Sequence, residues 1–316
     1  LNETNKKLTA QLLGAISSLI KDPKMIHPYL DIIFPNLKAA LFDSSPDVRN
    51  AMAKAIGGLT KSLGDLYKHE IIDWVSYYLE HEVDLVQRSG AAQAYAEILI
   101  AFGENNIAKT LPEIISKIRT DDKVKKEGYM SIFVFMPSCL GQRFEKYFDF
   151  IFPLIIDGFS DDNEKVRNVS NKIFEICISI FAKKSTKELV SPLLIRLFDS
   201  NWRIRNSSIA LIKTLINSLG NEFYKEESDY FTKELREDIL ANTFILKADV
   251  SGNTGTIANM IWRDYVDNIP KFISRILNQI FNKVVFLFSS KNDDIIEIAE
   301  GLINLLVNKF SDIFKK

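Results

Sequence analysis

The sequence predicts an all-α fold, an α-solenoid of about seven repeated helix pairs, and a recurring turn motif carries this prediction. Each copy has an acidic or polar turn, then an aliphatic residue with a basic residue just after it, then a segment rich in small residues. The four clear copies and one weaker copy span 43–49, 82–88, 161–167, 199–205 and 121–125. Their basic residues lie 39, 37, 42 and 38 residues apart, and in chain order they are Arg49, Arg88, Lys125, Arg167 and Arg205.

A repeat of about 40 residues built from two helices is typical of HEAT and armadillo arrays. In such arrays each repeat contacts only its neighbours, so the 316 residues are expected to form a single array. A hydrophobic content of 47% is ample for the core of that array. The chain begins at Leu1 and shows no polar capping repeat at either end, and we therefore expect a fragment of a longer solenoid.

The spacing of apolar residues assigns the repeats in order. Residues 1–22 are expected to be a partial repeat that contributes a second helix and ends at Pro23. Full repeats are expected at 26–64, 67–103, 107–141, 144–182, 187–220, 235–268 and 272–310. Residues 221–234 are polar and aromatic without a helical face and are expected to form an insertion. Four second helices are followed by a glycine as a stop signal, namely Gly64, Gly103, Gly141 and Gly220.

A proline recurs inside the first helix of the repeats. The prolines lie 13 or 14 residues before the basic residue of the motif and are Pro35, Pro112, Pro153 and Pro192. Trp74 takes this place in the second repeat. Because an internal proline removes a backbone hydrogen bond, we expect each one to kink its helix and to give successive repeats the same bend. The second helix of the first repeat is rich in alanine and glycine, which allow neighbouring helices to approach closely.

The turn motif has an expected structural role. An aspartate or asparagine just before the second helix can cap its free N–H groups, while the valine or isoleucine fills the gap between the two helices. The arginine lies in the first turn of the second helix, where the helix dipole disfavours a cation. We expect an aspartate of the same or the next repeat to compensate it, forming a ladder. The residues assigned to this ladder and turn are Arg49, Arg88, Arg167, Arg205, Asp43, Asp161 and Asp199.

The fifth turn departs from the pattern. Trp202 and Arg203 add a large aromatic residue and a second arginine, which are the residue types most enriched in binding hot spots. Packing of Trp202 against the next repeat is the alternative, and Arg203 is then the better candidate for an external contact.

Basic groups on short segments could contact ribosomal RNA or an acidic partner, although such a group is more often a solvated face. They are Lys123, Lys125, Lys126, Arg143, Lys146, Lys183, Lys184 and Lys187. The residues selected as candidates for partner binding are Trp202, Arg203, Lys123, Lys126, Lys183 and Lys184.

No catalytic or metal-binding constellation can be read from the sequence, so we expect no enzyme activity, metal or cofactor. His69 and Glu70 lack a second histidine at the spacing that a zinc-protease helix requires, because Asp73 stands there. The segment 58–62 lacks the glycine before the lysine of a phosphate loop. The net charge of −1 gives no overall attraction to nucleic acid or membrane. No apolar run reaches the roughly 18 residues of a membrane span.

The two cysteines, Cys139 and Cys177, lie in apolar runs and are expected to be buried free thiols. This usage is typical of cytosolic proteins rather than of secreted disulfide scaffolds.

Several stretches carry a family resemblance. Residues 22–41 resemble the HEAT region of translation elongation factor three and, more closely, the matching segment of the translational activators called general control non-derepressible protein one. Residues 88–97 and 202–208, Gly128-Tyr129, Trp262 and Pro270 are similar to the same family. The resemblance covers nearly the whole chain. It is weakest across the insertion and at Thr254-Gly255, where the family pattern leads us to expect Val-Arg.

The resemblance implies a function. Members of this family are cytosolic scaffolds that bind translating, often stalled or collided, ribosomes. They help to activate the kinase that phosphorylates the α subunit of initiation factor two during amino-acid starvation. The matched segment is the elongation-factor-three-like part, which implies contact with the ribosome, including ribosomal RNA, and with an ABC-type ATPase partner. Two alternatives stay open: a general HEAT adaptor for nuclear transport or a phosphatase, and the HEAT region of an ATPase like elongation factor three.

Overall fold

A computed structural model of the chain describes residues 3–19, 22–81, 84–225, 230 and 232–310. Within these residues the secondary structure consists of α-helices and short 3-10 helices, with no β-strand. Successive α-helices pack in pairs, so the predicted α-solenoid fold class is confirmed. None of the described helices combines the length and the apolar character that crossing a membrane requires.

The helices group into two compact units. Unit 1 comprises residues 1–144 and 162–173, and unit 2 comprises residues 145–161 and 174–316. The helices of unit 1 are α1 (Glu3–Leu19), α2 (Leu30–Leu41), α3 (Pro46–Leu63), α4 (Asp65–Glu80), α5 (Leu85–Ala101), α6 (Glu104–Ile118) and α7 (Lys123–Leu140). Those of unit 2 are α8 (Phe148–Gly158), α10 (Thr186–Arg196), α11 (Trp202–Leu219), α12 (Lys233–Ile245), α13 (Thr254–Tyr265), α14 (Ile269–Leu287) and α15 (Asp293–Phe310). Helix α9 (Glu164–Phe181) contributes residues to both.

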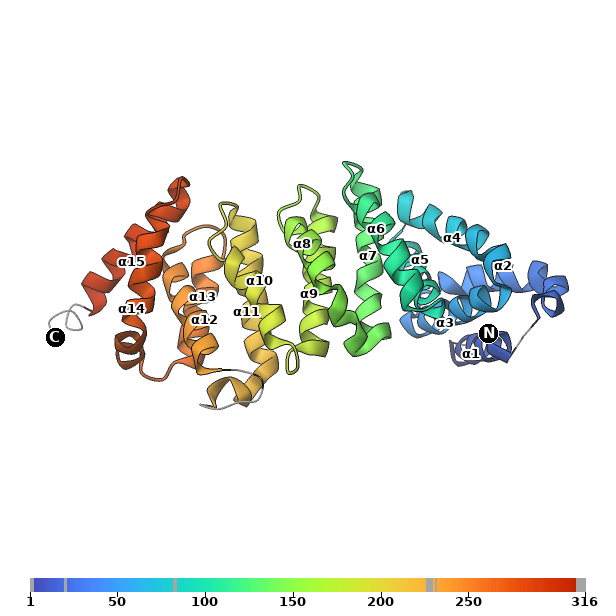
Figure 1. Cartoon of the computed structure of the whole chain (residues 1–316), viewed down its shortest axis with the longest axis horizontal. Helices are drawn as coiled ribbons and strands as arrows, with labels where there is room; N and C mark the ends of the chain where they lie inside the picture. Colours follow the sequence, from blue (N-terminus) through green and yellow to red (C-terminus); the bar gives the residue numbers. More distant parts are fainter. Residues whose placement is uncertain (1–2, 20–21, 82–83, 226–229, 231, 311–316) are drawn as a thin grey trace. The chain divides into compact units, whose positions relative to one another are not determined.

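In unit 1 the second helices of the pairs form one layer. Helix α1 packs on α3, α3 on α5, and α5 on α7, while α2 and α4 pack against α3 and α5 (Figure 1). Small residues permit this close packing, as predicted. A Cβ atom added to Gly57 of α3 would lie 2.8 Å from the carbonyl oxygen of Glu97 in α5. The alanine- and glycine-rich helices therefore bring backbones together where larger side chains would clash.

The predicted stop glycines end four second helices. Gly64 follows α3 with φ +67°, and its N–H group donates to the carbonyl oxygens of Thr60 and Lys61. Gly103, Gly141 and Gly220 also have positive φ angles. Left-handed backbone of this kind is accessible to glycine at little cost, which explains why this residue type recurs at the helix ends.

The predicted prolines lie inside first helices of the pairs, Pro35 in α2, Pro112 in α6, Pro153 in α8 and Pro192 in α10. The kink expected at each of them stays a prediction. The insertion expected at 221–234 falls partly outside the described residues, at 226–229 and 231. Its last part belongs to the next helix, because α12 begins at Lys233 with Thr232 accepting a hydrogen bond from the N–H group of Leu235 at 3.2 Å.

Candidate partner-binding surfaces

The turns between paired helices are held by polar caps. Asp84 accepts a hydrogen bond from the N–H group of Gln87 at 2.8 Å, and Asp122 accepts one from Val124 at 2.9 Å. Asn201 does the same for Arg203 at 3.0 Å. These caps satisfy N–H groups that have no partner within the helix, as the sequence led us to expect.

The four motif arginines share one contact, because each donates to a backbone carbonyl oxygen of its own turn. The acceptors are Asp43 and Ser44 for Arg49, His81 for Arg88, Asp162 for Arg167, and Asp199 and Ser200 for Arg205. These carbonyls follow the C-terminal end of the preceding helix, where the dipole is negative. The guanidinium group therefore closes the turn in addition to any ion pair that it forms.

Two of these arginines also pair with a carboxylate of the next repeat. Arg205 donates to Asp249 at 2.8 Å, and the two side chains are 0% and 1% exposed. Arg88 forms a buried ion pair with Glu127 of α7. Sequence reasoning missed both partners, because one is a glutamate and the other lies 44 residues away, beyond the insertion.

The aspartates assigned to the ladder make contacts within their own turns, and Asp43 also contacts α1. Asp43 accepts from the N–H group of Ser45 at 2.9 Å and pairs with Lys6, whose hydrogen bond lowers the pKa of the Asp43 carboxyl. Asp199 accepts from Asn201 at 2.9 Å and pairs with Arg196 at 3.0 Å. The backbone N–H group of Asp161 donates to the carbonyl of Gly158.

The weaker motif copy is held differently. The motif lysine Lys125 pairs with Glu80 of the preceding repeat at 3.2 Å. Glu80 also accepts hydrogen bonds from Lys117 and from the hydroxyl of Tyr129, each at 2.6 Å. Burial opposes ionisation of Glu80, but these three donors outweigh it and lower its pKa to about 2. Lys125 is therefore part of the structure rather than an open cation.

Two turns depart from the motif, the fifth turn with Trp202 and the sixth turn with Gly252, and these two turns lie against each other. Trp202 is 41% exposed, and its ring covers Gly252, where a Cβ atom would lie 2.8 Å from Cζ3 of the ring. The guanidinium carbon of Arg203 lies 5.4 Å from the centre of the Trp202 ring. Within the described residues the Arg203 side chain makes no hydrogen bond or ion pair, so its charge is open to a partner. Val250, which is 81% exposed, belongs to the same turn as Gly252.

One of the lysine candidates, Lys123, lines a pocket. Lys123 is exposed at the start of α7 and lines a polar pocket of about 370 Å³ in unit 1. Lys165, which sequence reasoning missed, lines the same pocket from the start of α9, and the pair of Arg88 with Glu127 lies at its wall. The sequence signal was available, since both lysines directly precede the aliphatic residue of the motif.

The other candidate cations lie apart from this pocket. Lys126 is half-buried in α7, and Lys183 and Lys184 are exposed in the turn after α9. Lys187 is exposed in the first turn of α10. Arg143 lies 3.9 Å from Glu104, and the ammonium of Lys146 lies 5.2 Å from the centre of the Tyr147 ring.

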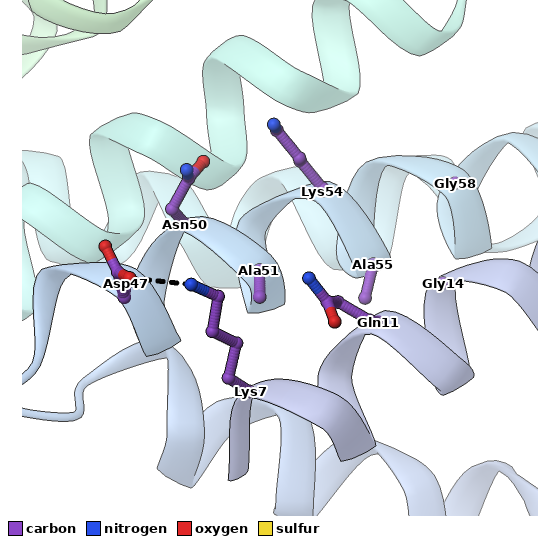
Figure 2. Close-up of a pocket in the computed structure, with 9 residues that line it drawn as sticks. All are labelled: Lys7, Gln11, Gly14, Asp47, Asn50, Ala51, Lys54, Ala55 and Gly58. Atoms are coloured by element: carbon purple, nitrogen blue, oxygen red, sulfur yellow. Dashed lines mark hydrogen bonds and ion pairs between the residues drawn. The ribbon is translucent and has the colours of Figure 1, made fainter. Parts of the chain in front are cut away.

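A second pocket of about 440 Å³ lies between α1 and α3 and was not predicted. Figure 2 shows Lys7 of α1 directed towards Asp47 of α3, where the two form an ion pair at 2.7 Å. The small residues Gly14, Ala51, Ala55 and Gly58 line the same pocket. Its signal in the sequence is the run of small residues in 51–58, which leaves the surface between the helices hollow.

The residues considered for chemistry do not assemble into a site within the described part of the chain. His69, Glu70 and Asp73 are exposed along α4, and no cluster of three or more His, Cys, Asp or Glu residues that could hold a metal ion occurs there. Both cysteines are free, Cys177 buried and Cys139 only half-buried. Burial raises the pKa of each thiol to about 12, so neither is a reactive thiolate at neutral pH.

Comparisons with known proteins indicate which family the chain belongs to. The sequence model of the HEAT repeat matches residues 33–63. The human "Stalled ribosome sensor GCN1" is 30% identical over 97% of this chain, and the Saccharomyces cerevisiae "eIF-2-alpha kinase activator GCN1" is 28% identical over 96%. The chain spans only 12% of the length of each relative. A solved "Kap95:Nup1 complex" aligns with 97% of this chain and 39% of its own, with 15% identity and a TM-score of 0.43. From the match along nearly the whole sequence and the helix pairs that carry it, we identify the chain as a HEAT-repeat region of the GCN1 translational activators.

Proposed function

We propose that this HEAT-repeat region is a non-catalytic scaffold that docks on ribosomes and on an ABC-type ATPase partner in the cytoplasm. Through these contacts it would serve the amino-acid starvation response that activates the kinase of initiation factor two α. The observation that carries the proposal is the match over 97% of the chain to a relative named as a stalled ribosome sensor. A solenoid suits such a role, because stacked repeats present extended surfaces rather than a closed active site.

Contact with ribosomal RNA is assigned to the exposed lysines. Lys123 and Lys165 project from the first turns of α7 and α9, where the helix dipole adds positive potential to that of the ammonium groups. Lys126, Lys183 and Lys184 are further candidates for phosphate contact. Neutralising phosphates releases bound counterions, so this type of binding depends steeply on salt.

Contact with the protein partner is assigned to the turn that carries Trp202 and Arg203. The ring is exposed on one side, and the guanidinium group above it has its donors available for carboxylates. Aromatic residues concentrate binding energy at protein interfaces because they bury large areas with few rotatable bonds. Arginine does so because its planar guanidinium group donates a fork of hydrogen bonds and stacks on rings.

Cosedimentation with purified ribosomes at graded salt tests the RNA contact. We expect the wild-type chain to sediment at low salt and Lys123→Glu with Lys165→Glu to sediment less, with a salt slope shallower by about 2. The matched control is Lys271→Glu with Lys291→Glu, which changes exposed lysines of α14 and of the turn before α15. Wild-type protein that stays in the supernatant at low salt would contradict ribosome docking.

Retention of an ABC-type ATPase on the immobilised chain tests the protein contact. Arg203→Glu is expected to weaken retention at least about tenfold if the residue lies in a hot spot. Lys172→Glu, an exposed charge reversal on α9, serves as the control. If Arg203→Glu retains the ATPase as well as the wild type does, Arg203 is not part of the partner-binding surface. Separately, ATP hydrolysis by the purified chain alone would contradict the non-catalytic role.

A further inference from the structure

A groove between α2 and α4 in unit 1 is separate from every surface assigned above. It encloses about 210 Å³ and is called here the α2–α4 groove. Leu30 and Ile71 are buried along it, and Phe34 and Trp74 add half-buried aromatic rings. Small-molecule sites usually enclose about 300–1,000 Å³, so this groove is sized for one or two side chains of a larger partner.

The aromatic wall of the groove arises from the repeat pattern. Trp74 of α4 stands at the place that a proline occupies in four other first helices, α2, α6, α8 and α10, and Pro35 of α2 lines the same groove. The ring of Trp74 extends into an aromatic cluster, with Phe42 at 6.2 Å and Tyr78 at 6.0 Å between ring centres. A tryptophan at this position therefore opens a flat aromatic face towards the groove instead of a compact proline ring.

The groove favours a cation. Asp31 and Glu70 line it with exposed carboxylates, and within the described residues neither makes an ion pair or a side-chain hydrogen bond. The ammonium nitrogen of Lys38 lies 4.8 Å from the centre of the Trp74 ring, so the ring face already holds a positive charge from the chain itself. The groove is therefore lined by two carboxylates without an ion-pair partner and by one lysine that contacts the Trp74 ring, so its net charge is negative.

We propose that the α2–α4 groove binds an extended segment of a partner protein in which an arginine is flanked by proline or aliphatic residues. The guanidinium group stacks on Trp74 and pairs with Asp31 and Glu70, while the flanking residues cover Phe34 and Pro35. Arginine fits better than lysine because its planar group stacks on aromatic rings and donates a fork of hydrogen bonds to carboxylates. The proposal does not depend on ribosome docking, since none of the cations assigned to RNA lines this groove.

Isothermal titration of the purified chain with two synthetic peptides tests this assignment. The probe is acetyl-Gly-Leu-Pro-Arg-Pro-Leu-Gly-amide, and its control carries citrulline, which has nearly the shape of arginine without the charge. We expect the arginine peptide to bind about fivefold more tightly at low salt, and the difference to shrink as salt screens the carboxylates. Equal affinity for the two peptides, or no binding of either, would overturn the proposal.

Three variants localise the effect. Asp31→Asn with Glu70→Gln should remove the preference for arginine, whereas Asp149→Asn with Glu188→Gln, which neutralises exposed carboxylates of α8 and α10, should keep it. Lys38→Met should tighten binding of the arginine peptide, because it vacates the Trp74 ring and removes a repelling charge. Unchanged melting temperatures establish that each variant is folded. Weaker binding by Lys38→Met, or a preference that survives in the first double variant, would contradict the proposed site.

Discussion

At the residue scale, glycines in the second helices mark where one repeat meets the backbone of the previous one. A Cβ atom on Gly128 would lie 2.0 Å from the carbonyl oxygen of Leu79, and one on Gly90 would lie 2.3 Å from that of Leu41. Both glycines stand four residues after the aliphatic residue of their motif, and the same place holds the buried Ser170 and Ser208 in later repeats. In the second to fifth repeats this position therefore holds small residues where successive pairs pack closely, whereas the first repeat has Met52 there.

Gly128→Ala tests this close packing. We expect the free energy of unfolding to fall by about 1–3 kcal/mol, because backbone must move to admit the methyl group. Gly58→Ala in α3 is the matched control, since its Cβ atom would have no neighbour nearer than 3.8 Å. The control should be neutral or stabilising by up to about 1 kcal/mol, as expected for alanine over glycine in a helix. Urea unfolding followed by circular dichroism measures both, and equal effects would contradict the packing argument.

The hydrogen-bonded carboxylate of Glu80 predicts a dependence of stability on pH. Its folded pKa of about 2 lies below the ordinary value of 4.5, so the ionised form stabilises the fold. That contribution is complete above pH 4.5 and is lost as the pH falls towards about 2.

Urea unfolding of wild type and Glu80→Gln between pH 7 and pH 2.5 measures this contribution. The wild type is expected to be the more stable at pH 7, and the gap should close as the pH drops below 4.5. Glu188→Gln removes an exposed carboxylate of α10 and serves as the control. A gap that stays constant across this range would exclude Glu80 as the titrating group.

At the scale of elements, the sixth turn is built around side chains from the fifth. Arg205 of α11 reaches Asp249 and Ser251, and the Trp202 ring rests on Gly252. Gly255 leaves no room for a side chain, because its Cβ atom would lie 2.5 Å from the carbonyl oxygen of Asp249. The Val-Arg pair expected at 254–255 is therefore excluded by the backbone.

Asp249→Asn tests the link between α11 and the sixth turn. Removing one charge of a fully buried pair should lower the free energy of unfolding by about 3 kcal/mol, since Arg205 then keeps only the exposed carboxylate of Asp294, at 3.7 Å. Arg205→Met combined with Asp249→Leu should recover part of this loss, because neither variant side chain is charged. Chemical unfolding of the single and double variants measures the coupling. If the double variant loses more free energy of unfolding than the two single variants lose together, the two residues do not act as an isolated pair.

At the scale of the whole molecule, the solenoid implies that stability is local. Each repeat contacts its neighbours only, so a weakened interface loosens adjacent helices before distant ones. Hydrogen exchange on Gly128→Ala should therefore show faster exchange in α4–α7 and unchanged rates in α12–α15. Asp249→Asn should reverse this distribution, with the faster exchange in α11–α13. Uniform acceleration along the chain in either variant would indicate one cooperative fold instead.

The sequence predicts best those features that depend on residues close together along the chain. Gly64 as a stop and Asp84 and Asp122 as caps act within a few residues of themselves, so local patterns sufficed. The role of Asp43 was expected to be a side-chain contact with arginine, but the arginine instead uses the carbonyl oxygen of that residue. The pattern of residue types does not distinguish these two acceptors.

The sequence by itself determined the period of the array, the pairing of helices and the chemistry of the turns, because propensities, caps and apolar spacing act over one repeat. Only the tertiary structure decided that Asp249 pairs with Arg205, that Trp202 covers Gly252, and that Trp74 faces a groove with Pro35. These contacts join residues of different repeats, and they depend on how one helix pair stacks on the next. That stacking is fixed by the packing of many side chains together, which no single motif records.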